Sequence, residues 1–336
     1  LFGLYFKQEV CMEKKLISIV TPCFNEDENV VEVYLQVKKI IENQLSEYIY
    51  EHIFIDNAST DNTAELLKDI AKIDKNVKII INSRNFGHIR SPVYGMMQAK
   101  GDIVISLVAD LQDPPEMIID FIKAYEEGYN IVLAIKSSSK ENSLMFKVRK
   151  IYYNILKKIS DTEIYENYTG FGLYDKKTIK ALERMPDAYP FFRGMIAEIG
   201  YKVKKISYEQ PLRNKGITKN NFYTLYDIGI LGLINNSKVL LRLSIFIGFI
   251  VGVLSIIVGI FYLVIKLMYW DSLSLGVAPI LIGGSLMFSM LLFFIGILGE
   301  YTGQIYTQTL NRPLVFEQER INFKRPLNNS KFPSQI

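Results

Sequence analysis

The sequence predicts an α/β domain with a mostly parallel sheet, followed by two helices that are long and apolar enough to span a membrane. Two observations predict this organisation. Short β-branched runs alternate with helical patterns in the first half of the chain. Charged residues make up 22% of the 336 residues, yet they almost vanish between Arg242 and Glu300. A wholly soluble enzyme, a fibrous repeat and uniform disorder are therefore excluded.

Five strands are expected in the first half, each a short apolar and β-branched run. They cover residues 17–21, 52–56, 77–81, 103–107 and 131–135. Helices fit between them. Asn62 with Glu65 predicts one helix start, and Pro114-Pro115 predicts another at Glu116, because proline suits the first turn of a helix and not its interior. In an open sheet of this kind, ligands bind beyond the carboxyl ends of the strands.

Two uncharged stretches follow in the second half. Residues 243–265 would span about 35 Å as a helix, which is enough to cross a bilayer. Residues 272–299 contain a second apolar run, 280–298. A pair of buried core helices is the alternative, but a soluble core helix seldom stays apolar on every face over this length. We therefore expect a two-helix transmembrane hairpin and a protein located in a membrane.

Basic residues near the ends of these stretches predict the orientation. The connecting loop offers only Lys266, whereas six cations flank the hairpin on its other side. They are Lys238, Arg242, Arg312, Arg320, Lys324 and Arg325. Both termini and the α/β domain are therefore expected in the cytoplasm. The expected organisation is an N-terminal extension (1–14), an α/β catalytic domain (15–205), a juxtamembrane interfacial segment (206–240), two transmembrane helices (241–300) and a cytoplasmic C-terminal tail (301–336).

Composition and missing motifs exclude several partners. The net charge of +4 is too small and too dispersed for a nucleic-acid footprint. Cys11 and Cys23 can form neither a disulfide framework nor a zinc cluster, which is typical of reduced cytosolic thiols. The chain has no GxGxxG after a strand and no GxxxxGK[ST], so an NAD-dependent oxidoreductase is disfavoured and any nucleotide must be held another way.

Polar residues follow the first, second and fourth predicted strands. The first ends in TPCFNE and the second in DNASTD, whose carboxylates and amides can bind a base and a ribose, although Asp and Asn are also ordinary turn formers. After the fourth strand, Asp110 and Gln112 present hard oxygen ligands suited to Mg²⁺ or Mn²⁺. Such an ion would neutralise a leaving diphosphate. Asp113, before Pro114, is expected to cap the next helix.

Five segments occur in order along the chain: TPCFNEDENV, IDNASTDNT, NSRNFGHIRSPVYGMMQAKGD, ADLQDPPE and GEYTGQIYTQTLNRP. Together they resemble the membrane-bound family-two glycosyltransferases, and within them the polyprenyl-phosphate group of bactoprenol glucosyltransferases and dolichyl-phosphate mannose synthases. The resemblance covers roughly Lys15 to Pro313. It implies a GT-A (Rossmann-like) fold and an inverting, metal-dependent transfer of a sugar from a UDP- or GDP-sugar to a polyprenyl phosphate in the bilayer.

The resemblance also implies roles for individual residues. Donor binding falls to Pro22, Asn25, Glu26, Asp56, Arg84, Asn85 and Gly87. The metal and diphosphate ligands are Asp110 and Gln112. The acceptor phosphate and the diphosphate would meet Arg193, Arg213 and Lys215, for which simple positive-inside anchoring is the alternative. Phe222, Tyr223 and Tyr226 suit an interfacial helix. His88 is taken as a surface or packing residue and not as a base.

Four positions depart from the family pattern. Asn57 stands where a second Asp is common, and Val108 where many members have the first acid of an Asp-Ala-Asp triplet. Gly170 and Gly172 replace the acid and the arginine of a Gly-Asp-Phe-Arg-Leu segment. These departures motivate one alternative, a non-catalytic membrane subunit. They do not exclude catalysis, because a phosphate monoester is largely dianionic at neutral pH and needs little help from a general base.

Two further questions stay open at this stage. A processive polysaccharide synthase shares the catalytic domain, but the chain lacks the Gln-x-x-Arg-Trp motif and its sole Trp270 lies in the predicted outer loop. Gly248 and Gly252 have GxxxG spacing, which fits packing within the hairpin and a homo-oligomer interface equally well. The sugar, the nucleotide and the lipid carrier are not identified by the sequence.

Overall fold

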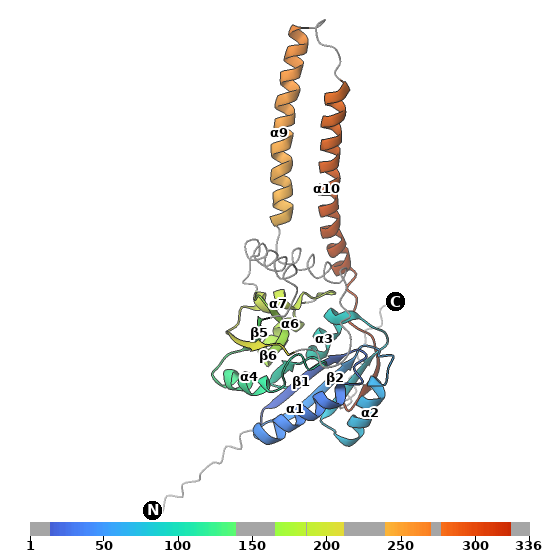
Figure 1. Cartoon of the computed structure of the whole chain (residues 1–336), viewed down its shortest axis with the longest axis vertical. Coiled ribbons are helices and arrows are strands. Elements are labelled where there is room, and N and C mark those ends of the chain that lie inside the picture. Colours follow the sequence, from blue (N-terminus) through green and yellow to red (C-terminus); the bar gives the residue numbers. More distant parts are fainter. Residues whose placement is uncertain (1–13, 139–164, 186, 212–238, 270–276, 324–336) are drawn as a thin grey trace, which may run out of the picture. The chain divides into compact units, whose positions relative to one another are not determined.

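The computed structural model describes residues 14–138, 165–185, 187–211, 239–269 and 277–323 (Figure 1). The chain divides into two compact units. The first, called the sheet unit, comprises Leu1–Asn142, Tyr165–Lys219 and Pro313–Ile336. The second, called the helical unit, comprises Ser143–Ile164 and Asn220–Arg312. Of the interfacial segment expected at 206–240, residues 212–238, which include Arg213 and Lys215, lie outside the described residues, whereas residues 206–209 belong to a strand of the sheet unit.

The sheet has eight strands within the described part of the chain, in the order β7-β5-β6-β4-β1-β2-β3-β8. Their bounds are β1 Leu16–Cys23, β2 Ile49–Asp56, β3 Val77–Asn82, β4 Ile103–Ser106, β5 Ile131–Ser138, β6 Tyr168–Asp175, β7 Val203–Glu209 and β8 Glu317–Ile321. Strand β1 pairs in parallel with β2 and β4, and β2 pairs in parallel with β3. Strand β6 is antiparallel to β4 and β5. The predicted mostly parallel sheet and its five predicted strands are confirmed.

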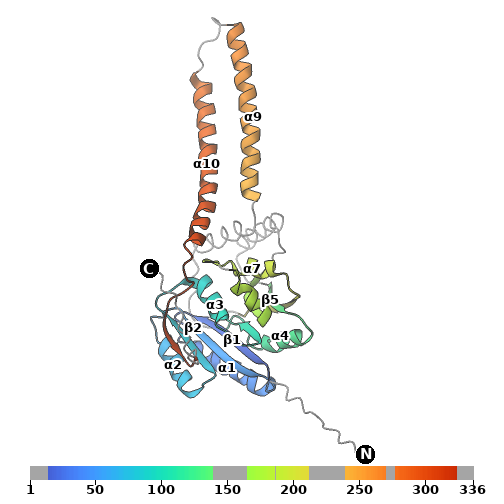
Figure 2. The same cartoon turned by 180° about the vertical axis from the view of Figure 1, so that it is seen from behind.

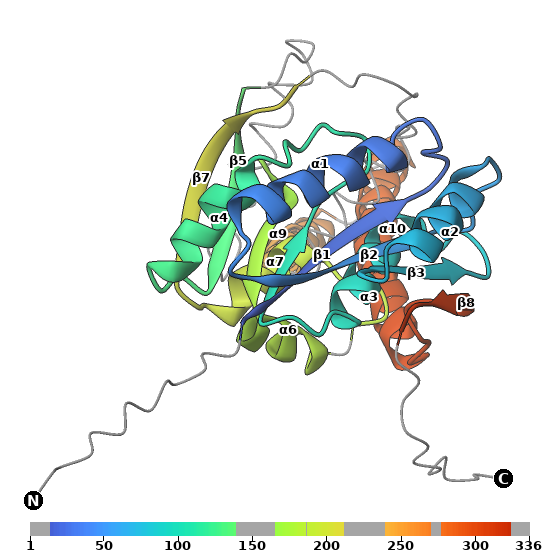
Figure 3. The ribbon, with the colours of Figure 1, turned by 90° about the horizontal axis from the view of Figure 1, so that it is seen from below.

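Strands β6, β7 and β8 were not predicted from the sequence, and each has a physical reason. Strand β6 contains Gly170 and Gly172, and glycine weakens a strand pattern. Strand β7 is an edge strand rich in lysine, and lysine is one device that protects sheet edges. Strand β8, with the sequence EQERI, follows the second apolar helix and pairs antiparallel with β3 at the other edge (Figure 3).

Helices cover both faces of the sheet. On one face lie α1 (Val30–Gln44), α2 (Thr63–Ile73) and α4 (Met117–Glu126), which stand in front of the strands in Figure 3. On the other lie α3 (Gly87–Met97), α6 (Lys176–Glu183) and α7 (Phe192–Ile199), of which α3 and α7 are labelled in Figure 2. Ile53 and Ile55 of β2 face the α3 side and Phe54 faces the α2 side, so this strand is buried on both faces, as parallel strands usually are.

The two predicted helix starts fall within one residue of the observed ones, but the capping groups differ. Helix α2 begins after Asn62, whose side chain makes no capping bond. Asp61 accepts the Thr63 amide hydrogen bond instead, at 2.9 Å. Helix α4 begins at Met117 without a side-chain cap, so the prediction that Asp113 caps it was wrong. Asp113 is 3% exposed and accepts a hydrogen bond from a tyrosine hydroxyl.

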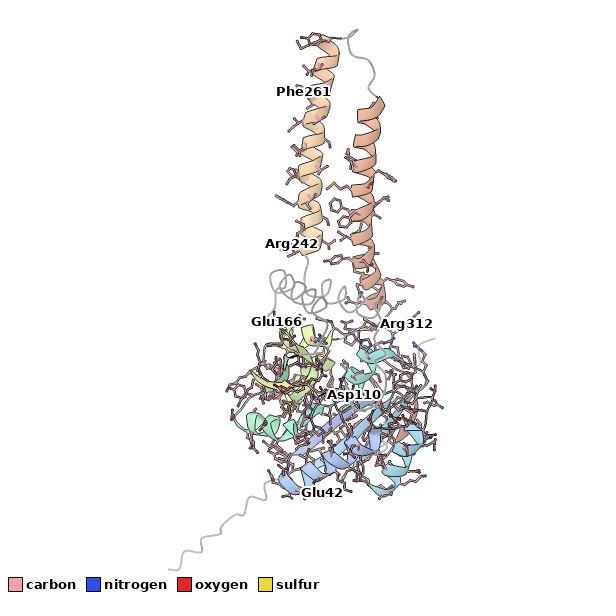
Figure 4. All side chains as sticks on the ribbon, in the orientation of Figure 1. Glu42, Asp110, Glu166, Arg242, Phe261 and Arg312 are labelled. Atoms are coloured by element: carbon pink, nitrogen blue, oxygen red, sulfur yellow. The ribbon has the colours of Figure 1, made fainter. Side chains whose placement is uncertain are left out.

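The helical unit contains α9 (Val239–Met268) and α10 (Val277–Thr309), which contact each other. Their apolar side chains point outward: Phe249 is 70% and Phe261 65% exposed, and Figure 4 labels Phe261 on α9. None of the stretch Leu241–Phe261 is buried, and only 6% of Leu286–Thr309 is. The helices of a soluble core would have buried these faces. The predicted pair of long apolar helices is therefore confirmed.

Phe121 of α4 provides a test of the packing on the α1 side of the sheet. It is completely buried and meets the Phe171 ring edge-on, with the ring centroids 5.0 Å apart. Phe121→Ala should lower the free energy of unfolding by about 3–5 kcal/mol through the cavity it leaves. Ile73→Ala, at a position 86% exposed, should change it by less than about 0.5 kcal/mol. Denaturant unfolding of the full chain in detergent measures both, and equal effects would contradict the assigned core.

Candidate active site

The strand order reverses at β1. From β1 the chain proceeds through β2 to β3 on one side, whereas β4 lies on the other side of β1. Because these four strands are parallel, their carboxyl ends share one edge of the sheet. Ligands of open α/β sheets bind outside the carboxyl ends at such a reversal. The segments that follow these strands, residues 24–29, 57–62, 83–87 and 107–113, are called the strand-end loops and form the candidate active site.

The loops after β1 and β2 are hydrogen-bonded to each other. Asn25 has a left-handed backbone, with φ at 55°, which Asn tolerates better than most residues. Its amide donates to Ser59 Oγ at 2.8 Å, and its side-chain oxygen accepts from the Thr60 amide at 2.7 Å. The Glu26 amide donates to Thr63 Oγ1 at 2.8 Å. Pro22 lies inside β1, opposite Ile55.

Asp56 ends β2 and anchors the loop that follows it. Its carboxylate is 1% exposed and accepts hydrogen bonds from the Ser59 amide, at 3.1 Å, and from the Ser59 hydroxyl. Burial raises the pKa of the Asp56 carboxyl, against the lowering effect of the two Ser59 hydrogen bonds. The residue that the family resemblance assigns to the base or ribose thus also fixes the shape of its own loop.

Asn57 joins the loops after β2 and β3. Its side-chain nitrogen donates to Asn85 Oδ1 at 2.8 Å and to the Gly87 carbonyl at 3.2 Å. Its side-chain oxygen accepts from Asn82 Nδ2 at 3.0 Å and from the Phe86 amide at 2.9 Å. Both ends of the amide are used, so a carboxylate, which only accepts, could not replace it. The departure from aspartate at this position has a structural reason.

The segment after β3, which the resemblance assigns to the sugar donor, carries a cation at the carboxyl ends of the strands. The Arg84 guanidinium lies 4.1 Å from the centroid of the Phe86 ring, which is buried. Gly87 has φ at +85° and begins α3, a conformation that favours glycine. Its amide donates to Asn85 Oδ1 at 2.8 Å. Three of the predicted donor residues, Arg84, Asn85 and Gly87, are thereby held in one short turn.

Asp110 and Gln112 lie in the strand-end loop after β4, and Figure 4 labels Asp110. Asp110 is half-buried, and its Oδ1 accepts the Gln112 amide hydrogen bond at 3.1 Å. Among the residues that the structure describes, no group of three His, Cys, Asp or Glu side chains could hold a metal. One carboxylate and one side-chain amide suit an ion such as Mg²⁺, which keeps several waters and takes further ligands from phosphates. The donor set fits such an ion.

Arg193 lies in the first turn of α7 and is half-buried. Desolvation lowers the pKa of His88, and the positive charge of Arg193 lowers it further. The structure therefore brings Arg193, which the resemblance assigns to the acceptor phosphate, near the segment that carries Arg84, Asn85 and Gly87. The other two residues with that assignment, Arg213 and Lys215, lie outside the described residues.

The two glycines that replace the family's acid and arginine both lie in β6. Gly170 has φ at +107°, where a side chain would strain the backbone. A Cβ on Gly172 would collide with the Val132 carbonyl oxygen of β5. Side chains at these two positions are therefore incompatible with this backbone, and the chemistry of the site must come from other residues.

Carboxylate, amide and guanidinium groups thus lie at the carboxyl ends of the parallel strands, and the sequence has no glycine-rich phosphate loop after a strand. The chain belongs to glycosyl transferase family 2, whose model matches residues 18–199, and it is therefore a glycosyltransferase. This confirms the predicted resemblance and gives the mixed, mostly parallel sheet its class, a GT-A-like fold.

Individual relatives agree with the family. The chain is 31% identical to the uncharacterized glycosyltransferase YkcC of Bacillus subtilis, over 90% of this chain and 93% of the relative. It is 32% identical to the SfII prophage-derived bactoprenol glucosyl transferase of Shigella flexneri, over 88% of this chain and 96% of the relative. Among solved structures it is similar to the mannosyltransferase PcManGT from Pyrobaculum calidifontis in complex with GDP-Man and Mn²⁺, with a TM-score of 0.42 and 16% identity over 66% of this chain and 63% of that one.

Asn57→Asp tests whether this position is a lost acid or a structural amide. The variant would direct a carboxylate oxygen at the Asn85 side-chain oxygen and the Gly87 carbonyl, both acceptors. We expect the free energy of unfolding to fall by about 1–3 kcal/mol and calorimetry to show weaker binding of UDP and GDP. Asn43→Asp, at an exposed position of α1, is the matched control and should change neither quantity. Unchanged stability with tighter nucleotide binding in Asn57→Asp would mean that the amide is dispensable.

Proposed function

We propose that this glycosyltransferase moves a sugar from a UDP- or GDP-sugar to a polyprenyl phosphate, with inversion at the anomeric carbon, and makes a polyprenyl-phosphate sugar. The observation that carries the proposal is the likeness to a bactoprenol glucosyl transferase at 32% identity over 88% of the chain. This match extends well beyond residues 18–199, the part that the family model covers. The likeness therefore includes much of the C-terminal portion as well as the transferase domain.

The exposed apolar faces of α9 and α10 support a lipid acceptor. Side chains such as Ile245 (72% exposed) and Phe249 (70%) would be solvated unfavourably in water, and contiguous apolar surface of this kind marks a membrane contact. Helices of 30 and 33 residues are long enough to cross the hydrocarbon core. We propose that both helices span a bilayer and that the excess of basic residues around the hairpin ends keeps the sheet unit in the cytoplasm.

The proposed transfer to a phosphate needs little help from a general base. A phosphate monoester has its second pKa near 6, so the acceptor reaches the donor already ionised. Alignment of the two substrates and stabilisation of the leaving diphosphate then account for most of the rate enhancement. The glycines at positions 170 and 172 agree with this division of work, because the chain provides no acid or arginine there.

Individual residues would divide the tasks as follows. Asn25 and Asp56, in loops that are bonded to each other through Ser59, would hold the nucleoside. Arg84, Asn85 and Gly87 would line the donor, where a guanidinium binds phosphate oxygens in two places. Asp110 and Gln112 would hold Mg²⁺ or Mn²⁺, which when bound neutralises negative charge on the diphosphate. Arg193, with Arg213 and Lys215, would hold the acceptor phosphate.

Replacing Asp110 tests both the function and the metal site. Membranes that contain the protein, incubated with radiolabelled sugar nucleotides, polyprenyl phosphate and Mn²⁺, should yield a lipid-extractable labelled sugar. Asp110→Ala should reduce that product roughly 100-fold or more, the scale of losing one group that stabilises developing charge. Asp120→Asn is the control: this aspartate is ion-paired with Lys123 on the surface of α4, and its loss should leave activity unchanged.

Three outcomes would contradict parts of the proposal. Full activity of Asp110→Ala would refute the metal role. Label recovered in a water-soluble polymer, with none in the lipid extract, would point to a polysaccharide synthase. Absence of product with every sugar nucleotide, together with nucleotide binding that is indifferent to Mn²⁺, would favour a non-catalytic subunit.

A further inference from the structure

The strand-end loop after β4, residues 107–113, is called the metal-site loop here. One of its residues has a backbone conformation that its side chain does not favour. Leu111, between Asp110 and Gln112, has φ at 57°, in the left-handed region that residues with a Cβ rarely adopt. Such a conformation persists only where the surroundings fix it. The Gln112 amide contributes by donating to Asp110 Oδ1 at 3.1 Å. That bond is local, so a second contact must fix the loop against the rest of the sheet.

Asp113 supplies that second contact. It directly follows Gln112, is 3% exposed, and its Oδ1 accepts a hydrogen bond of 2.8 Å from the Tyr208 hydroxyl. It does not cap the helix that follows. Its charge-assisted bond to a tyrosine is of the stronger kind. The bond therefore links the metal-site loop to β7, the edge strand at one end of the sheet.

Tyr208 is itself held from several sides. It is 8% exposed, its ring meets the Phe171 ring edge-on with the centroids 5.7 Å apart, and its backbone carbonyl accepts from Ser137 Oγ at 3.0 Å. Phe171 belongs to β6 and directly follows Gly170. Tyr208 thus contacts the loop after β4 through its hydroxyl and β6 through its ring.

We propose that Tyr208 is a positioning residue: through Asp113 it sets the geometry of the metal-site loop, and through Phe171 it aligns that loop with the β6 segment beside Gly170. The role rests on the proposed function, because the loop is taken to bind an ion and a diphosphate. Tyr208 need not touch either ligand. It acts by holding the loop in the arrangement in which Asp110 and Gln112 can share one ion.

The chain contains a matched control. Tyr34 of α1 is also 8% exposed, and its hydroxyl donates to the buried carboxylate of Asp74 at 3.0 Å. Asp74 lies just before β3 begins, at the edge of the sheet opposite to the strand-end loops. Tyr208→Phe and Tyr34→Phe therefore each remove a buried tyrosine–aspartate bond, the first beside the site and the second remote from it, where Asp74 keeps its bonds from Lys38 and Tyr50.

The test measures Mn²⁺ binding by the full chain in detergent, by electron paramagnetic resonance in the presence of UDP or GDP, with thermal unfolding recorded in parallel. Tyr208→Phe should weaken Mn²⁺ binding by about tenfold, whereas Tyr34→Phe should leave it unchanged, although both lower the melting temperature. In Asp113→Ala the loss should match that of Tyr208→Phe, and the double variant should be no worse than either single one, because both remove one bond.

The outcomes separate this proposal from the proposed function. Equal Mn²⁺ affinity in Tyr208→Phe and Tyr34→Phe overturns the positioning role, as does an additive double variant. A wild-type protein that binds no Mn²⁺ with either nucleotide overturns it as well. If the wild-type protein binds Mn²⁺ and Tyr208→Phe weakens that binding, the positioning role is upheld even where no sugar reaches polyprenyl phosphate, and only the assigned acceptor fails.

Discussion

The reversal of strand order at β1 is the constraint on which the candidate active site depends. Because β4 and β2 flank β1 in parallel and β3 continues the parallel order, four loops leave the sheet at the same edge. Those after β1, β2 and β3 bond to one another: Asn25 with Ser59, and Asn57 with Asn85. The edge is therefore an interlocked set of turns, and a change in one loop alters the surroundings of its neighbours.

This interlocking explains why departures from the family pattern need not mean a degenerate site. Asn57 uses its donor and its acceptor, which aspartate could not do. Gly172 allows β6 to approach the Val132 carbonyl of β5. In both cases the residue that differs is the one that the local backbone requires. In the proposed function, metal binding then depends on a single carboxylate, Asp110, with help from Gln112.

The sequence predicted what local patterns encode. The five buried strands, both helix starts and the apolar helices α9 and α10 follow from periodicity, proline placement and the loss of charge. Strand β8 could not be predicted in this way, since EQERI becomes a strand only by pairing with β3. Asp113 was assigned as a helix cap because its true partner, Tyr208, lies 95 residues away and belongs to a strand that was itself not foreseen. Contacts of this kind are set by topology and leave no local signal.

The position of β8 in the chain has a consequence for biosynthesis. This strand belongs to the sheet unit, yet the ribosome makes it after both apolar helices. While α9 and α10 are being synthesised, the edge of β3 that later pairs with β8 therefore has unpaired backbone N–H and C=O groups. An open strand edge is a template for wrong pairing. Completion of the sheet therefore follows the synthesis of both apolar helices, and a chain that stops short of residue 317 leaves that edge uncovered.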